Sequence, residues 1–85
     1  MRHARDPALD AIEPLLAELR QLPGLTERKR GTFYRKTRAF LHFHEDPAGM
    51  FADIRGPDDG DFERYDVTER AVQIELVAIA RRRLA

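Results

Sequence analysis

The decisive stretch of this sequence is residues 39–55: Ala39-Phe40-Leu41-His42-Phe43-His44-Glu45-Asp46-Pro47-Ala48-Gly49-Met50-Phe51-Ala52-Asp53-Ile54-Arg55. Two β-prone runs, 39–44 and 50–55, lie on either side of a short segment with turn chemistry. That segment, 46–49, begins with aspartate and proline and ends with glycine, which is a typical turn composition. The stretch therefore predicts an antiparallel hairpin with a four-residue loop at 46–49.

This loop predicts the register of the hairpin. Glu45 faces Met50, and counting outward the pairing continues until Phe40 faces Arg55. Directly opposed residues of an antiparallel pair share one face of the sheet, and a shift by one residue would mix apolar and polar side chains. The face expected to pack under helices holds Leu41, Phe43, Ala52 and Ile54. The candidate ligand or interaction face holds Phe40, His42, His44, Phe51, Asp53 and Arg55.

Helical patterns flank the hairpin on both sides. A first helix is expected from Pro7, with Asp6 as its N-cap. Pro14 lies inside that pattern and has no amide hydrogen, so the helix should kink or restart there. A second helix is expected to run from an N-cap at Thr68 to about Leu84, with an apolar stripe along one side.

The remaining segments complete a fold prediction. Residues 26–30 are expected to form a polar connector, while 32–34 and 62–66 are expected to add short strands. Residues 1–85 are thus expected to form a single α+β domain. Its predicted architecture is a two-layer sandwich with an N-terminal helix, a three- to four-stranded antiparallel sheet and a C-terminal helix.

Length and composition limit the classes of function. The chain has 85 residues, no cysteine and a net charge of zero. Because a domain of this size buries only about 60–65% of its unfolded surface, a ligand should bind at the surface, at a sheet edge or between subunits. The sequence has no secretory leader pattern and no apolar run long enough for a membrane span, so the bacterial cytoplasm is the expected location.

Nucleophilic catalysis finds no support in the sequence. It contains neither cysteine nor serine, and its threonines lack the glycine-rich surroundings of a nucleophile elbow. The glycines at 56 and 60 bound an acidic turn that would repel phosphate. We therefore expect a protein without catalytic activity, and an enzyme only through the histidines.

The histidines form the sharpest local feature. His42 and His44 lie two residues apart on one strand, so they point the same way with Cα atoms roughly 6.5–7 Å apart. With Asp53 opposite His42, these three side chains are candidate ligands for a divalent metal such as zinc. The alternative is a structural role, in which His42 donates a hydrogen bond to Asp53 and no cofactor is bound.

Charge and aromatic residues suggest partners. Basic residues crowd 28–38 and 81–83, and acidic residues crowd 45–66. This pattern indicates either solvated faces or an interface for self-association with a second copy or a protein partner. Phe33 and Phe62 are further aromatic candidates for the ligand face, which would then be able to stack nucleic-acid bases. Nucleic-acid binding is nevertheless disfavoured because the chain has no basic excess.

The segment Phe33-Tyr34-Arg35-Lys36 followed by Ala39-Phe40-Leu41-His42-Phe43-His44-Glu45-Asp46 and Phe51-Ala52-Asp53 resembles a family of short uncharacterised bacterial proteins. The resemblance covers roughly residues 9–80 and implies no catalytic residues. The order of helix, strands and helix is also similar to the domain of the MmcQ/YjbR family.

Three functions follow, in order of preference. The first is a small interaction or ligand-binding protein without catalytic activity, able to form homodimers. The second is a metal-binding, hydrolytic protein that uses the His-x-His pair, and the third is a nucleic-acid-binding protein.

Overall fold

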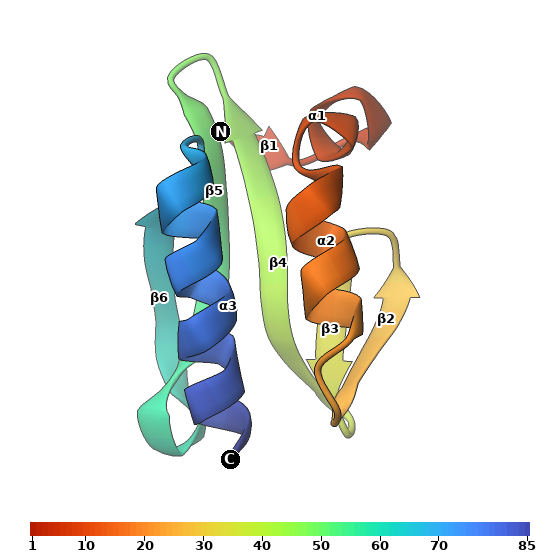
Figure 1. Cartoon of the computed structure of the whole chain (residues 1–85), viewed down its shortest axis with the longest axis vertical. Coiled ribbons are helices and arrows are strands. Elements are labelled where there is room, and N and C mark those ends of the chain that lie inside the picture. The colour runs from red at the N-terminus through yellow and green to blue at the C-terminus, as the bar shows by residue number, and fades with distance from the viewer.

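The structure, a computed structural model that describes residues 1–85, is a two-layer α+β sandwich. Its six-stranded antiparallel sheet has the order β2-β3-β4-β5-β6, and β1 pairs with β4. All helices lie over the same face of the sheet, with α2 and α3 side by side (Figure 1). The elements are β1 (Arg2–His3), α1 (Asp6–Ala11), α2 (Glu13–Arg20), β2 (Leu25–Lys29), β3 (Thr32–Arg35), β4 (Arg38–Asp46), β5 (Gly49–Gly56), the 3-10 turn η1 (Pro57–Asp59), β6 (Gly60–Asp66) and α3 (Arg70–Leu84).

The predicted fold class is confirmed, although the sheet has more strands than the predicted three or four. The two extra strands are β1, which has only two residues, and β2. Residues 26–30 were expected to form a connector, and that prediction is wrong for most of them, because β2 spans Leu25–Lys29. This strand is at the sheet edge and is mostly exposed, so its polar sequence carries no alternation of buried apolar residues.

The predicted register of the central hairpin is confirmed from Leu41 opposite Ile54 to Glu45 opposite Met50. The strands extend further than expected, because Asp46 also pairs with Gly49. The connection therefore has two residues, Pro47 and Ala48, rather than four.

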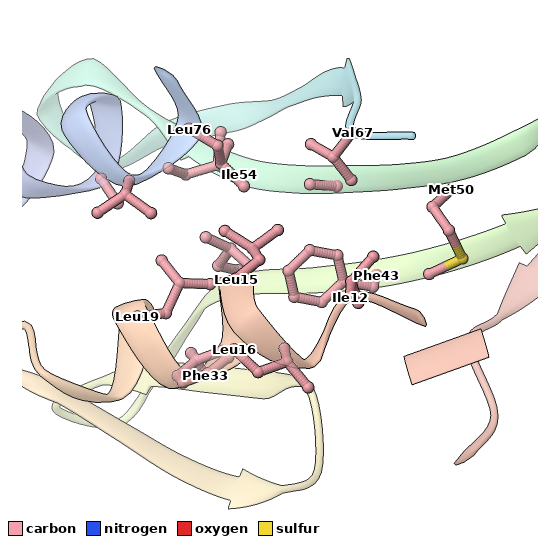
Figure 2. Close-up of a cluster of buried hydrophobic side chains, with 14 of the residues drawn as sticks. Ile12, Leu15, Leu16, Leu19, Phe33, Phe43, Met50, Ile54, Val67 and Leu76 are labelled. Atoms are coloured by element: carbon pink, nitrogen blue, oxygen red, sulfur yellow. The ribbon is translucent and has the colours of Figure 1, made fainter. Parts of the chain in front are cut away.

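The core lies between the helices and the hairpin. The predicted core residues Leu41, Phe43, Ala52 and Ile54 are each at most 3% exposed. Figure 2 shows Ile54 close to Leu76 of α3, and Phe43 close to Ile12 at the junction of α1 and α2. This packing fixes which side of the hairpin faces the helices, and so it leaves the other side of the sheet without a helical layer.

Pro14 marks the restart of the N-terminal helix, as predicted. α1 ends at Ala11, and α2 begins at Glu13 with Pro14 in its first turn, where the missing amide hydrogen needs no partner. The predicted N-cap is wrong, because Asp6 lies inside α1 and Arg5 occupies the cap position.

Thr68 does not cap the C-terminal helix either. Glu69 is the N-cap of α3, and the Thr68 hydroxyl instead donates to Asp66 Oδ1 at 2.6 Å. The same hydroxyl accepts the Met50 amide hydrogen at an N···O distance of 3.0 Å. It therefore ties the strand end to the hairpin rather than starting the helix.

Phe40 and Phe33 belong to the core and not to the candidate ligand face, so their predicted positions are wrong. They are 3% and 1% exposed, respectively. Between β3 and β4, Phe33 pairs with Leu41 while Tyr34 pairs with Ala39, so Phe40 is an extra residue in a bulge. The bulge interrupts the alternation of faces and lets two consecutive residues, Phe40 and Leu41, both be buried.

None of the helices has the length and apolar composition that crossing a membrane would require.

Candidate functional site

The candidate site lies on the sheet face that no helix covers. His42 and His44 of β4 alternate with the core residues Leu41 and Phe43, so they project from the opposite face. β1 adds His3 directly opposite His44 on the other edge of β4. These three are the only histidines of the chain, and they come together at one place. We call His3, His42 and His44 the histidine cluster.

The three imidazole rings are in mutual contact. The ring centroids of His3 and His44 lie 4.6 Å apart, those of His42 and His44 5.1 Å, and those of His3 and His42 5.8 Å. His42 is nearly perpendicular to His44, at an interplanar angle of 88°. The rings are in contact, but the ligand nitrogens that lie within 4.8 Å of each other are those of His42 and His44, and His3 is not part of that group.

Asp53 lies beside the histidine cluster and is held by Arg64. The Arg64 guanidinium donates two hydrogen bonds to the carboxylate, Nε to Oδ1 at 2.7 Å and Nη2 to Oδ2 at 2.8 Å. His44 Nε2 lies 3.2 Å from the same Oδ2. The hydrogen bonds from Arg64 are the largest of the effects that lower the pKa of Asp53, against a burial that would raise it. Asp53 is therefore a buried anion next to His44.

The predicted pairing of His42 with Asp53 is wrong. The two residues oppose each other in the register, but it is His44 that contacts the carboxylate, through the oxygen that Arg64 also binds. His42 Nδ1 is instead buried and has no hydrogen-bond partner.

His42 is kept neutral by its surroundings. Burial lowers the pKa of His42 below its usual range, and the nearby His44 lowers it further. A neutral imidazole retains a lone pair on one ring nitrogen, which is the form that binds a metal ion. The unpartnered Nδ1 is thus available as an acceptor or as a ligand.

The structure brings together the predicted metal-ligand set. One ligand atom from each of His42, His44 and Asp53 can be chosen so that all three lie within 4.8 Å of one another. The fit is better for the imidazoles than for Asp53, because the Arg64 hydrogen bonds occupy both carboxylate oxygens.

The other predicted face residues surround this group. Phe51 opposes His44 and is half-buried, while Arg55 donates hydrogen bonds to the Ala39 carbonyl oxygen at 2.9 and 3.2 Å. The Arg55 guanidinium carbon lies 4.0 Å from the ring centroid of Phe62, and that ring lies 4.8 Å from the ring of His42. Phe62 was a correct aromatic candidate for this face.

Sequence reasoning missed His3 and Arg64. Arg64 follows from one further step of register counting, since it opposes Asp53 across β5 and β6. His3 lies in a two-residue strand, which is too short to produce a periodic pattern. The only sequence signal for His3 was its residue type, because the chain has just three histidines.

No family model matches this sequence, and neither a curated protein nor a solved structure shows significant similarity to it. The resemblances described above to a family of short bacterial proteins and to the MmcQ/YjbR domain accordingly stay predictions.

Proposed function

We propose that this protein binds a divalent transition-metal ion of the zinc type at the histidine cluster, where His42 and His44 already converge and His3, whose ring contacts both, joins them by turning its exposed side chain. The observation that carries the proposal is that all the histidines of the chain, from two different strands, meet on the one sheet face without helices. Imidazole nitrogen is the commonest protein ligand for such ions, and three protein ligands make a sufficient set.

Asp53 supports the site from the outside rather than as a ligand. Ligating imidazoles usually contact a carboxylate through the nitrogen that does not bind the metal, and this contact orients the ring. His44 Nε2 lies 3.2 Å from Asp53 Oδ2, and Arg64 fixes that carboxylate through two hydrogen bonds. This arrangement leaves Nδ1 of His44 for the ion.

The unpartnered nitrogen of His42 favours ligand binding over a purely structural cluster. A buried polar atom without a partner costs about 1–3 kcal/mol. In a structural network every buried member should be satisfied, whereas His42 Nδ1 has no partner within the chain. A bound ion would be the partner of this nitrogen. The free-energy cost of leaving it unpaired is then expected in the metal-free protein.

The arrangement of the cluster favours a metal-binding protein over a metal-dependent hydrolase. Three imidazoles leave one position of a tetrahedral ion open. The only carboxylate among the predicted ligands, Asp53, is ion-paired with Arg64 and is a weak proton acceptor, since its pKa is lowered.

The test is a titration of the tag-free, metal-free protein with zinc chloride, followed by calorimetry and by thermal unfolding. We expect binding of one ion per chain and a rise in melting temperature, because a ligand at 100 times its dissociation constant stabilises by about 2.7 kcal/mol. Affinity should fall as the pH drops through the histidine range, since protonated imidazole does not bind metal.

The decisive variant is His3→Ala. His3 is exposed, so its removal should leave the melting temperature of the metal-free protein nearly unchanged. It should nevertheless weaken zinc binding by at least about tenfold, as expected for the loss of one metal ligand. Glu69→Ala, which removes an exposed carboxylate, is the control and should bind like the original protein. Binding that survives both His3→Ala and His44→Ala, or no binding at all, would contradict the proposal.

A further inference from the structure

A hollow of about 580 Å³ opens next to the histidine cluster, where the sheet is interrupted. β3 pairs with β4 only as far as Leu41, and β1 pairs with β4 only from His44 onward. Between these pairings the edge of β4 receives one backbone hydrogen bond, from the Ala4 amide to the Phe43 carbonyl oxygen at 3.0 Å. The hollow lies at this gap, and His3 lines it.

The lining of the hollow is strongly basic. Four of its eight residues are Arg2, Arg5, Lys29 and Arg30, and Asp6 is the only carboxylate among them. The apolar lining residues are Ala4 and Leu9, and both also line a smaller hollow of about 150 Å³ that is bounded by Phe43 and Thr32.

Two of these cations, Arg5 and Lys29, form no ion pair through their side chains. Arg30 is neutralised, since its Nη1 lies 3.0 Å from Asp6 Oδ1 and 2.9 Å from Asp10 Oδ1. Arg2 pairs with Glu45 at 2.9 Å. Lys29 forms no ion pair with any carboxylate of the chain, and Arg5 forms none through its guanidinium, although Glu45 accepts its amide hydrogen at 2.8 Å and has a pKa lowered in part by the Arg5 charge.

We infer that this hollow binds a small oxyanion, either a phosphate or a carboxylate group. An arginine and a lysine that line one concave site are well suited to such a ligand, because charge-assisted hydrogen bonds to its oxygens are about twice as strong as neutral ones. Arg5 comes from the segment before α1, and Lys29 comes from the end of β2, so an anion between them would link two parts of the chain. Figure 1 shows α1 at the end of the sheet where β2 turns into β3. The inference goes beyond the metal site and does not require it.

The experiment is a titration of metal-free, isotope-labelled protein with inorganic phosphate and, separately, with acetate, at constant ionic strength. We expect saturable changes in the amide resonances of Arg5, Lys29 and Gly31, which flank the hollow. The anion with the lower dissociation constant identifies the class of ligand, and a saturable response to either anion supports the site.

The matched variants separate a site from a general charge effect. Arg5→Gln with Lys29→Gln should weaken the binding about tenfold or more, given about 1.5–3 kcal/mol for a hydrogen bond to a charged group. Arg81→Gln with Arg82→Gln makes the same change in net charge on exposed residues of α3 and should alter the dissociation constant by less than about twofold. An equal loss in both double variants, or no saturable change with the original protein, would overturn the inference. Either result would leave the zinc experiment unaffected.

Discussion

At the scale of single residues, the environment of His42 disfavours the protonated imidazole. Its Nδ1 is buried without a partner, and burial together with His44 lowers its pKa below the usual range. In the unfolded chain the pKa of a histidine is about 6.5. As the pH falls below that value, the unfolded state takes up a proton that the folded state resists. His42 therefore makes the free energy of unfolding decrease as the pH drops from about 7 toward 5.

We expect His42→Gln to reduce this loss of stability. Urea unfolding of the metal-free protein at about pH 7 and pH 5 should show a smaller difference between the two pH values for the variant than for the original chain. Ile74→Ala is the control, because it changes an exposed, non-titrating side chain on α3, away from the cluster, and it should retain the original difference. Asp53 does not interfere, since its lowered pKa places its own loss of stability below about pH 4. An unchanged pH dependence in His42→Gln would contradict the assignment.

The histidines also show how far sequence reasoning reaches at the scale of single residues. Hairpin register places His42, His44 and Asp53 on one face, and the structure brings them together as predicted. The register alone does not say which of these side chains contact each other, because the orientation of Asp53 depends on Arg64 from a third strand. His3 joins the cluster through a two-residue strand whose pairing is a tertiary contact rather than a local preference.

At the scale of elements, the hairpin β4–β5 organises the molecule. Its inner face includes Ile54, which is fully buried against Leu76 of α3 (Figure 2), while Ile74 on the outer side of α3 is 54% exposed. Ile54→Ala should lower the free energy of unfolding by about 2–5 kcal/mol, because it removes buried methyl groups and leaves a cavity.

Ile74→Ala is the matched control for this prediction. It makes the same chemical change at an exposed site, so it should alter the free energy of unfolding by no more than about 0.5 kcal/mol. Urea unfolding at one pH measures both variants. Similar losses in the two variants would mean that the inner face of the hairpin is not the core.

Elements whose apolar residues repeat regularly were predictable, and irregular ones were not. α3 and the central hairpin follow clear periods, so their positions were predicted to within about two residues. β2 is an exposed edge strand that reads Leu25-Thr26-Glu27-Arg28-Lys29, and its position depends on pairing with β3 rather than on its own composition. The bulge at Phe40 reverses the face of one residue, and no local pattern in the sequence marks that reversal.

At the scale of the whole molecule, folding brings part of the basic side chains into ion pairs with carboxylates of the chain. Arg30 contacts Asp6, Asp10 and Glu13, and the distant segments that hold Arg83 and Glu63 meet at 2.9 Å. Arg38 and Arg83 thus reach the acidic segment, at Asp59 and Glu63, but most of the other basic residues at 28–38 and 81–83 form no ion pair. The uncovered sheet face offers an exposed apolar side chain, Phe62, in addition to charge, and we therefore expect self-association there.

Phe62 is the residue on which such self-association can be tested. It is 36% exposed, lies on edge strand β6 and contacts His42, with ring centroids 4.8 Å apart. Because exposed apolar groups at an open sheet edge favour pairing with a second copy, we predict a homodimer through this face.

Light scattering of the metal-free protein at increasing micromolar concentrations should show the mass rise toward that of a dimer. Phe62→Ser should weaken this association, whereas Ile74→Ser, on the helical side of the molecule, should not. A constant monomer mass for the original chain would end the idea of self-association, and a dimer lost only in Ile74→Ser would place the interface on α3. Since a dimer at this face would cover His42, zinc and self-association should also affect each other, and linkage requires that effect to be reciprocal.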